Sequence, residues 1–162
     1  MFANGVDLTA GTDLEVDSSF ISSVKTMRRK KKPTKIIIDW SGNEMSAEEY
    51  SAYLAKGKTG AHLFIDYDGC VWQFADLWAQ QVTRCESVDE STIWIVLQNK
   101  GEPPESLHHR RGTFVETFNG KKASVLANTT DQLESLEAII WLVCESLQMP
   151  PLVHRNSAGE II

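Results

Sequence analysis

Hydrophobic residues gather in short blocks along the middle of the chain, and most blocks have the length of a β-strand. The first, Lys35–Trp40, contains three successive isoleucines and is closed by the turn-forming residues Ser41-Gly42-Asn43. A run of β-branched residues without polar alternation favours a strand that is buried on both faces. Thr92–Leu97 has the same character, so the sequence predicts two core strands.

Two further pairs of blocks are joined by turn signals. His62–Asp66 and Cys70–Phe74 flank Asp68-Gly69, and Asp-Gly favours a hairpin because glycine tolerates the positive φ of the turn. Thr113–Leu126 has Asn119-Gly120 at its centre and predicts a second hairpin for the same reason.

Two segments have helical spacing. Ser46–Glu49 is a capping box, in which a serine and a glutamate satisfy the first backbone N–H groups, and it opens a helix predicted over Ser46–Lys56. An apolar face over Asp131–Leu147 predicts a second helix with Thr129 as its N-cap. Strands mixed with two amphipathic helices predict the α/β class, with a single central mixed β-sheet flanked by helices.

The N-terminal 35 residues show no sustained strand or helix period, and they end in the basic run Arg28–Lys32 followed by Pro33. A block of like charges repels itself and is commonly solvated. We therefore divide the chain into an extended, partly disordered arm over 1–35, with a short helix near Phe20–Met27, and a folded domain over 36–162.

The composition is that of a globular protein with one domain, since 42% of the 162 residues are hydrophobic and 23% are charged. No apolar run approaches the roughly 18–20 residues that span a bilayer. The first twenty residues lack the basic and apolar regions of a secretion signal. The three cysteines have no metal-binding spacing, which is typical of free thiols in a reducing compartment. These features predict a cytoplasmic protein without a membrane partner.

Charge is distributed unevenly along the chain. Residues 25–35 contain seven of the sixteen lysines and arginines, whereas from Ile36 onward eighteen acids outnumber nine bases. Because an acidic body repels nucleic acid, we expect no nucleic-acid partner apart from contacts made by the basic run.

The order of motifs resembles that of a known enzyme superfamily. The matching segments occur in the family's order: Ile36–Ser41, Gly60–Gln73 with Asp68-Gly69 inside it, Ser91–Ile95, Phe118–Gly120, Thr130 with Gln132, and Val153–Arg155. In this order they resemble the zinc-dependent N-acetylmuramoyl-L-alanine amidases, which include amidase-2 enzymes, peptidoglycan recognition proteins and phage amidase-type lysozymes. The resemblance extends from about Ile36 to His154, and Gly60–Gln73 is its most specific part.

The resemblance implies a zinc held by three protein ligands with one open position. The first ligand falls on Asp39, whose carboxylate is shorter than the family's imidazole, and the second is retained as His154. The third falls on Ile162 or beyond. The family's catalytic aromatic residue falls on Ala61, and its basic or polar residue falls near Glu160. Four of these five positions therefore depart from the family pattern.

The contribution of zinc to catalysis can be compared with that of a carboxylate base. Zinc lowers the pKa of bound water from about 15.7 to about 7, which corresponds to about 12 kcal/mol of nucleophile activation. A carboxylate base supplies only about 3–5 kcal/mol. We therefore expect no zinc or other cofactor and no hydrolysis. The predicted function is a catalytically degenerate amidase-like module that binds a peptidoglycan fragment or a protein partner.

Five residues converge on the cleft in the resembled family and are the candidate ligand-binding residues: Asp39, Trp40, Trp78, Arg84 and His154. Arg84 could hold a carboxylate of a stem peptide. Asp39 could instead cap the turn that follows it. His62 matches a family position that is mostly structural.

Two other functions remain open. One is an active zinc-dependent peptidoglycan amidase with an unusual ligand set, built on Asp39 and His154. The other is a structural component of a phage or prophage that kept the fold. Such a component would use the basic run and an insertion over 101–125 as contact surfaces.

Overall fold

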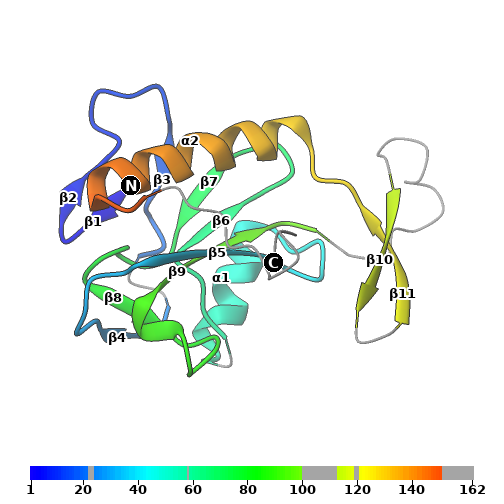
Figure 1. Ribbon diagram of the computed structural model, residues 1–162, viewed down its shortest axis with the longest axis horizontal. Coiled ribbons are helices and arrows are strands. Elements are labelled where there is room, and N and C mark those ends of the chain that lie inside the picture. Colours follow the sequence, from blue (N-terminus) through cyan, green and yellow to red (C-terminus); the bar gives the residue numbers. More distant parts are fainter. Residues whose placement is uncertain (22–23, 58, 100–112, 119–120, 151–162) are drawn as a thin grey trace.

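The computed structural model describes residues 1–21, 24–57, 59–99, 113–118 and 121–150, with the backbone alone for 113–118 and 121–126. Figure 1 shows one central sheet with helix α2 lying along it and a separate hairpin to one side. The last twelve residues, which include His154, lie outside the described part of the chain.

The central sheet contains five strands in the order β3-β7-β6-β9-β5. The three strands β5, β9 and β6 run parallel, β7 is antiparallel to β6, and β3 is parallel to β7. Their bounds are β3 (Val16–Asp17), β5 (Lys35–Trp40), β6 (Leu63–Ile65), β7 (Val71–Gln73) and β9 (Thr92–Leu97). The predicted mixed sheet is confirmed, and so is the first hairpin, in which Gly69 has a φ of +80°.

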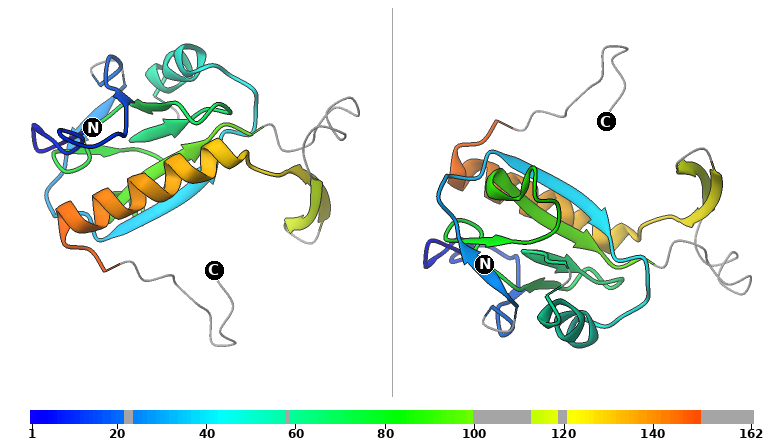
Figure 2. Two further views of the ribbon diagram at one scale, coloured as in Figure 1. Left: turned by 90° about the horizontal axis from the view of Figure 1, so that it is seen from above. Right: turned by 90° about the horizontal axis from the view of Figure 1, so that it is seen from below.

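The two predicted helices are α1 (Ala47–Ala55) and α2 (Thr130–Leu147), and each begins with a complete capping box. They cover opposite faces of the sheet (Figure 2). Leu63 and Ile65 of β6 pack with residues of α2, whereas the intervening Phe64 packs with residues of α1. This division follows from the alternation of side chains along a strand. The α/β architecture is therefore confirmed.

Strand β5 differs from the expectation of a strand buried on both faces. Among the described strands it lies at the edge of the sheet and pairs with β9 alone. Its side chains are half-buried or exposed, and 46% of Ile38 is accessible. The fully buried strand of this pair is β9. A triple-isoleucine block cannot distinguish an edge from a centre, because the sheet order depends on contacts that are distant in sequence.

The N-terminal segment packs against the sheet over most of its described length. Strands β1 (Phe2–Ala3) and β2 (Val6–Asp7) form a small hairpin, and the side chain of Met1 is in the core on the α2 side. The short helix expected near Phe20–Met27 is wrong for Thr26 and Met27. These two residues belong to β4 (Thr26–Arg28), which pairs with β8 (Gln80–Val82).

The second predicted hairpin is confirmed as β10 (Thr113–Phe118) paired with β11 (Lys121–Leu126). It forms its own two-stranded sheet and projects away from the central sheet (Figure 1). A short 3-10 turn, η1 (Asp89–Ser91), leads into β9. None of the helices in the described ranges has the length and apolar character needed to cross a membrane.

Candidate functional site

The candidate site is centred on an ion pair between Asp39 and Arg84. Asp39 lies near the end of β5, and Arg84 lies in the loop that follows β8. The Arg84 Nε atom donates to Asp39 Oδ2 at 3.0 Å, and Arg84 Nη2 donates to the same oxygen. The Arg84 side chain is 14% exposed and that of Asp39 is 35% exposed, so the carboxylate is the more accessible partner.

The remaining nitrogen of the guanidinium is also occupied. Arg84 Nη1 lies within hydrogen-bond distance of Thr59 Oγ1 and the carbonyl oxygen of Gly60, both at 3.2 Å, and of the Tyr50 hydroxyl at 3.4 Å. Its central carbon lies 5.4 Å from the centre of the Trp94 ring, within the range of a cation–π contact. Arg84 is therefore fixed from three sides.

The loop that carries Arg84 is held by a buried carboxylate. Asp89, which is 1% exposed, accepts the backbone N–H groups of Arg84 and Cys85 at 2.8 Å each. It also accepts the indole N–H of Trp94 at 2.9 Å. These three contacts fix the backbone on both sides of the arginine, so the ion pair is part of a preformed structure.

The local electrostatics keep the guanidinium charged. Burial by itself lowers the pKa of Arg84, but the hydrogen bonds that it donates to Asp39 and the negative charge of Asp39 raise the pKa above its ordinary value. Burial raises the pKa of the Tyr50 hydroxyl, which therefore stays protonated at neutral pH. The site combines one fixed cation, one anion and a neutral phenol.

Only part of the predicted site comes together in the structure. Asp39 and Arg84 are in contact, and Trp40 adjoins them, with its backbone N–H donating to Asp39 Oδ1 at 2.8 Å. Trp78 contacts a different region, where Lys32 Nζ lies 5.4 Å from the centre of its ring. His154 lies outside the described residues, so its place relative to Asp39 stays a prediction.

His62 is a buried structural residue, as expected. Its Nδ1 accepts the backbone N–H of Trp94 at 3.1 Å, and its Nε2 lies 3.1 Å from the carbonyl oxygen of Gln80. Burial, together with the nearby charge of Arg29, lowers the pKa of His62 to about 3, so the ring is neutral at pH 7. No ring nitrogen is directed to solvent, because the side chain is completely buried.

Sequence reasoning missed Tyr50, Thr59 and Arg29. Tyr50 lies inside the first predicted helix at a position that nothing in the sequence marks as a polar contact, and Thr59 precedes Gly60 in a loop without any motif. Arg29 lies inside a run of five basic residues, and nothing in the run distinguishes it from its neighbours. The contacts of all three depend on segments that are distant in sequence.

The described residues do not fit a zinc ion of the kind that the resemblance implies. Asp39, the position of the first ligand, has its carboxylate bound by a guanidinium. Ala61, the position of the catalytic aromatic residue, is completely buried in the core on the α1 side. Within the described ranges, no group of three His, Cys, Asp or Glu side chains is arranged to hold a metal.

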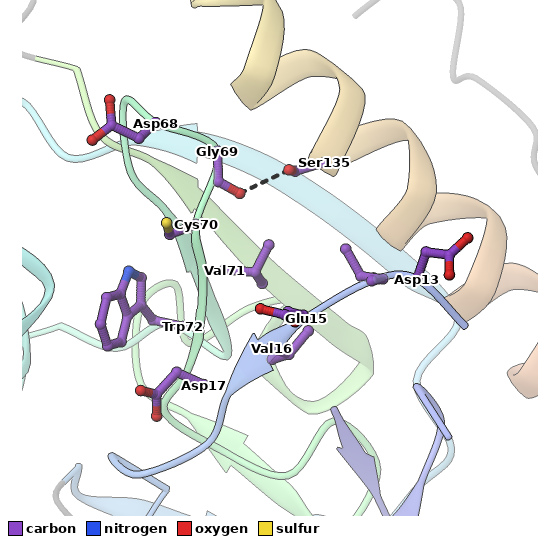
Figure 3. A pocket seen from close by; sticks show the side chains of 11 residues that line it. Asp13, Glu15, Val16, Asp17, Asp68, Gly69, Cys70, Val71, Trp72 and Ser135 are labelled. Atoms are coloured by element: carbon purple, nitrogen blue, oxygen red, sulfur yellow. Dashed lines mark hydrogen bonds between the residues drawn. The ribbon is translucent and has the colours of Figure 1, made fainter. Parts of the chain in front are cut away.

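A separate cavity of about 660 Å³ lies at the other edge of the sheet, beside β3 and β7 (Figure 3). Its wall includes the acidic residues Asp13, Glu15, Asp17 and Asp68, and Ser135 of α2 donates to the carbonyl oxygen of Gly69 at 2.7 Å. The four predicted site residues that the structure describes, Asp39, Trp40, Trp78 and Arg84, do not line this cavity.

Solved structures of three proteins have the same fold. PGRP-Hd from Alvinella pompejana aligns with a TM-score of 0.57 and 10% identity, over 91% of this chain and 90% of its own. Manduca sexta peptidoglycan recognition protein 1 aligns with a TM-score of 0.53 and 12% identity, over 84% of this chain and 74% of its own. The endolysin N-acetylmuramoyl-L-alanine amidase LysCS from Clostridium intestinale aligns with a TM-score of 0.52 and 14% identity, over 83% of this chain and 76% of its own.

These alignments confirm the fold predicted from the order of motifs, and at such low identity they show the fold alone. No protein-family profile matches the chain, and no curated protein sequence is significantly similar to it.

Proposed function

We propose that the protein is a catalytically degenerate amidase-like module that binds a peptidoglycan fragment next to the Asp39–Arg84 pair and does not hydrolyse it. The fold supports a peptidoglycan-related role, because the similar structures are those of peptidoglycan recognition proteins and an N-acetylmuramoyl-L-alanine amidase. The proposed absence of hydrolysis depends on the chemistry of this chain's own residues.

The observation that carries the proposal is the guanidinium of Arg84 bound to the Asp39 carboxylate. A divalent cation at Asp39 would face a fixed positive charge a few ångströms away. At 4 Å the repulsion between a divalent and a monovalent charge is of the order of several kcal/mol at an effective dielectric constant of about 20. Arg84 would have to leave its contacts with Thr59 and Gly60 to make room for the metal. The pair therefore opposes the metal that a hydrolase of this fold would need.

The exposed carboxylate indicates which ligand groups the pair can recognise. Both Arg84 Nε and Arg84 Nη2 are directed to Asp39, and Arg84 Nη1 is surrounded by three acceptors, so little of the guanidinium is left for a ligand carboxylate. Asp39 is more exposed and can accept further hydrogen bonds. Sugar hydroxyls and peptide N–H groups are the donors of a muramyl peptide that suit such an acceptor. We propose that these groups, and not a stem-peptide carboxylate, are what the site contacts.

Trp40 follows Asp39 in the chain and contacts its carboxylate through the backbone N–H. It is half-buried and lies at the end of the edge strand β5. Carbohydrate and peptide sites commonly combine an apolar wall with a few polar groups that fix the orientation of the ligand. Because successive side chains of a strand point to opposite faces of the sheet, the Trp40 ring does not flank the Asp39 carboxylate. The rings at the pair are those of Trp94 and Tyr50, which contact Arg84. Trp78 lies beside Lys32 on another surface.

Isothermal titration calorimetry with a muramyl peptide tests the binding. We expect a dissociation constant in the micromolar range or weaker. Asp39→Asn is expected to weaken binding about fivefold or more, because a charged acceptor forms stronger hydrogen bonds than a neutral one. Glu137→Gln, which removes one negative charge from an exposed position of α2, is the matched control and should leave the affinity unchanged.

The same samples test the absence of hydrolysis. After incubation with zinc, we expect mass spectrometry to recover the muramyl peptide intact. Cleavage of the lactyl-amide bond that a chelator abolishes would contradict the proposal in favour of an active amidase. Absence of heat at millimolar ligand would contradict the binding function and point to a protein partner instead.

A further inference from the structure

The basic run before the first long strand is an ordered surface feature. Of its five residues, Arg28, Lys30, Lys31 and Lys32 are exposed, whereas Arg29 is only 7% exposed. We refer to the four exposed residues as the basic strip. The buried side chain of Arg29, in the middle of the run, holds the basic strip in place.

Arg29 anchors the strip to the sheet. Its Nε donates to the carbonyl oxygen of Gln80 at 3.1 Å, and its Nη1 donates to the carbonyl oxygen of Glu90 at 2.6 Å. Its Nη2 donates to the carbonyl oxygen of Thr92 at 2.9 Å. The backbone N–H of Arg29 adds a bond to Ala79 at 2.9 Å, which extends the pairing of β4 with β8. Arg28 is therefore part of a paired strand, and Lys30 directly follows a residue whose side chain and backbone N–H are both bound.

The strip is positively charged although the chain has a formal net charge of −6. Residues 25–35 include no acid, and Lys31 forms an ion pair with Glu90 at 3.2 Å, in which both side chains are well exposed. Charges more than about 8–10 Å away are largely screened at physiological ionic strength. A ligand at the strip therefore experiences mainly the local cations and not the distant acids.

An exposed aromatic ring lies next to the strip. Trp78 is 36% exposed, and Lys32 Nζ lies 5.4 Å from the centre of its ring. Cations beside an accessible indole are the combination used for single strands of nucleic acid, where phosphates meet the charges and a base stacks on the ring. The three lysines of the strip act as point charges and so favour charge density over a particular ligand geometry.

We infer that the basic strip binds a flexible phosphodiester chain through its phosphate groups. This inference does not depend on the proposed function, because the strip and the Asp39–Arg84 pair share no residue. A single-stranded nucleic acid and a poly(glycerol phosphate) chain both present this chemistry. Trp78 distinguishes them, because only the nucleic acid has bases that can stack.

Fluorescence anisotropy at increasing salt, with labelled oligothymidylate and with labelled poly(glycerol phosphate), tests the inference. Four phosphate contacts predict a slope of about −3 for log K against log salt, or about a 50-fold loss of affinity between about 50 and 200 mM salt. Lys30→Gln/Lys32→Gln should halve that slope and lower the affinity at least tenfold at low salt. The matched control is Lys25→Gln/Lys56→Gln, which changes the net charge equally near Gly57, against which Lys25 packs.

The outcomes separate the two sources of phosphate. If Trp78→Ala weakens oligothymidylate binding about tenfold and leaves poly(glycerol phosphate) unchanged, the strip is supported as a nucleic-acid site. If Trp78→Ala affects neither polymer, the strip is supported as a site for the phosphate chain alone. Absence of binding at low salt, or an equal loss of affinity in the strip variant and its control, would overturn the inference.

Discussion

Among single residues, Asp39 and Arg84 form the ion pair at the centre of the candidate site. Arg84 satisfies the carboxylate, closes the loop against Thr59 and Gly60, and lies over Trp94. Asp39 and Arg84 could each be selected from the sequence as candidate site residues. Their pairing could not, because it depends on the path of the loop after β8, which is fixed by the backbone contacts of Asp89.

Loss of the Arg84 guanidinium should destabilise the protein. Arg84→Met removes the ion pair and the bonds to Thr59 and Gly60, so we expect the free energy of unfolding to fall by about 1–3 kcal/mol. Asp39→Asn should cost less, since this side chain is partly solvated, and the two losses should not add, with a coupling of about 1–2 kcal/mol. Urea denaturation of the two single variants and the double variant measures this cycle, and additive losses would contradict the pairing.

The buried imidazole of His62 predicts a pH dependence of stability. Its folded pKa of about 3 lies below the ordinary value of 6.5, so the unfolded state binds the proton more readily. Stability is therefore full above about pH 6.5 and is lost as the pH falls toward 3, by about 2 kcal/mol between about pH 8 and pH 5. Urea denaturation at several pH values should show this slope in the wild type and a flatter profile in His62→Gln. An equal slope in both proteins would contradict the assignment.

Among the secondary-structure elements, those with strong local signals were predictable. Both helices begin with capping boxes that can be identified in the sequence. Both predicted hairpins have Asp-Gly or Asn-Gly between their strands. The edge position of β5 and the pairing of β4 with β8 were not predictable, because each depends on a partner strand distant in sequence. The β1–β2 hairpin had a signal that was overlooked, since Asn4-Gly5 turns with φ of 53° and 74°.

The turn between β6 and β7 should tolerate no side chain at Gly69. This residue has a φ of +80°, and a Cβ placed on it would lie 2.8 Å from the carbonyl oxygen of Asp131 at the start of α2. Gly69→Ala should cost about 3 kcal/mol, from the strained φ and the clash together. Gly42→Ala is the control, because Gly42 also has a positive φ but no neighbour within 4 Å, and it should cost about 1 kcal/mol. Equal losses in thermal or urea unfolding would show that the contact with α2 is unimportant.

The molecule as a unit has the fold of peptidoglycan recognition proteins and of an amidase, and Asp39 of its candidate site is bound by Arg84. The fold was predictable from the order of motifs, because hydrophobic pattern and turn residues are sufficient to indicate where the strands and helices lie. The candidate site was only partly predictable, since the sequence places an aspartate at position 39 but does not show which group binds its carboxylate. In the structure this group is the guanidinium of Arg84, which is itself held by the hydroxyl of Thr59 and the carbonyl oxygen of Gly60.

The central claim, that Arg84 replaces a metal at Asp39, is tested most directly by zinc content. Protein purified without a histidine tag is incubated with equimolar zinc, dialysed and measured by elemental analysis. We predict far less than one zinc per chain, because the carboxylate is already bound by Arg84 and a second cation beside it is repelled. One zinc per chain in the wild type that is lost in His154→Ala would contradict the claim and restore the zinc amidase.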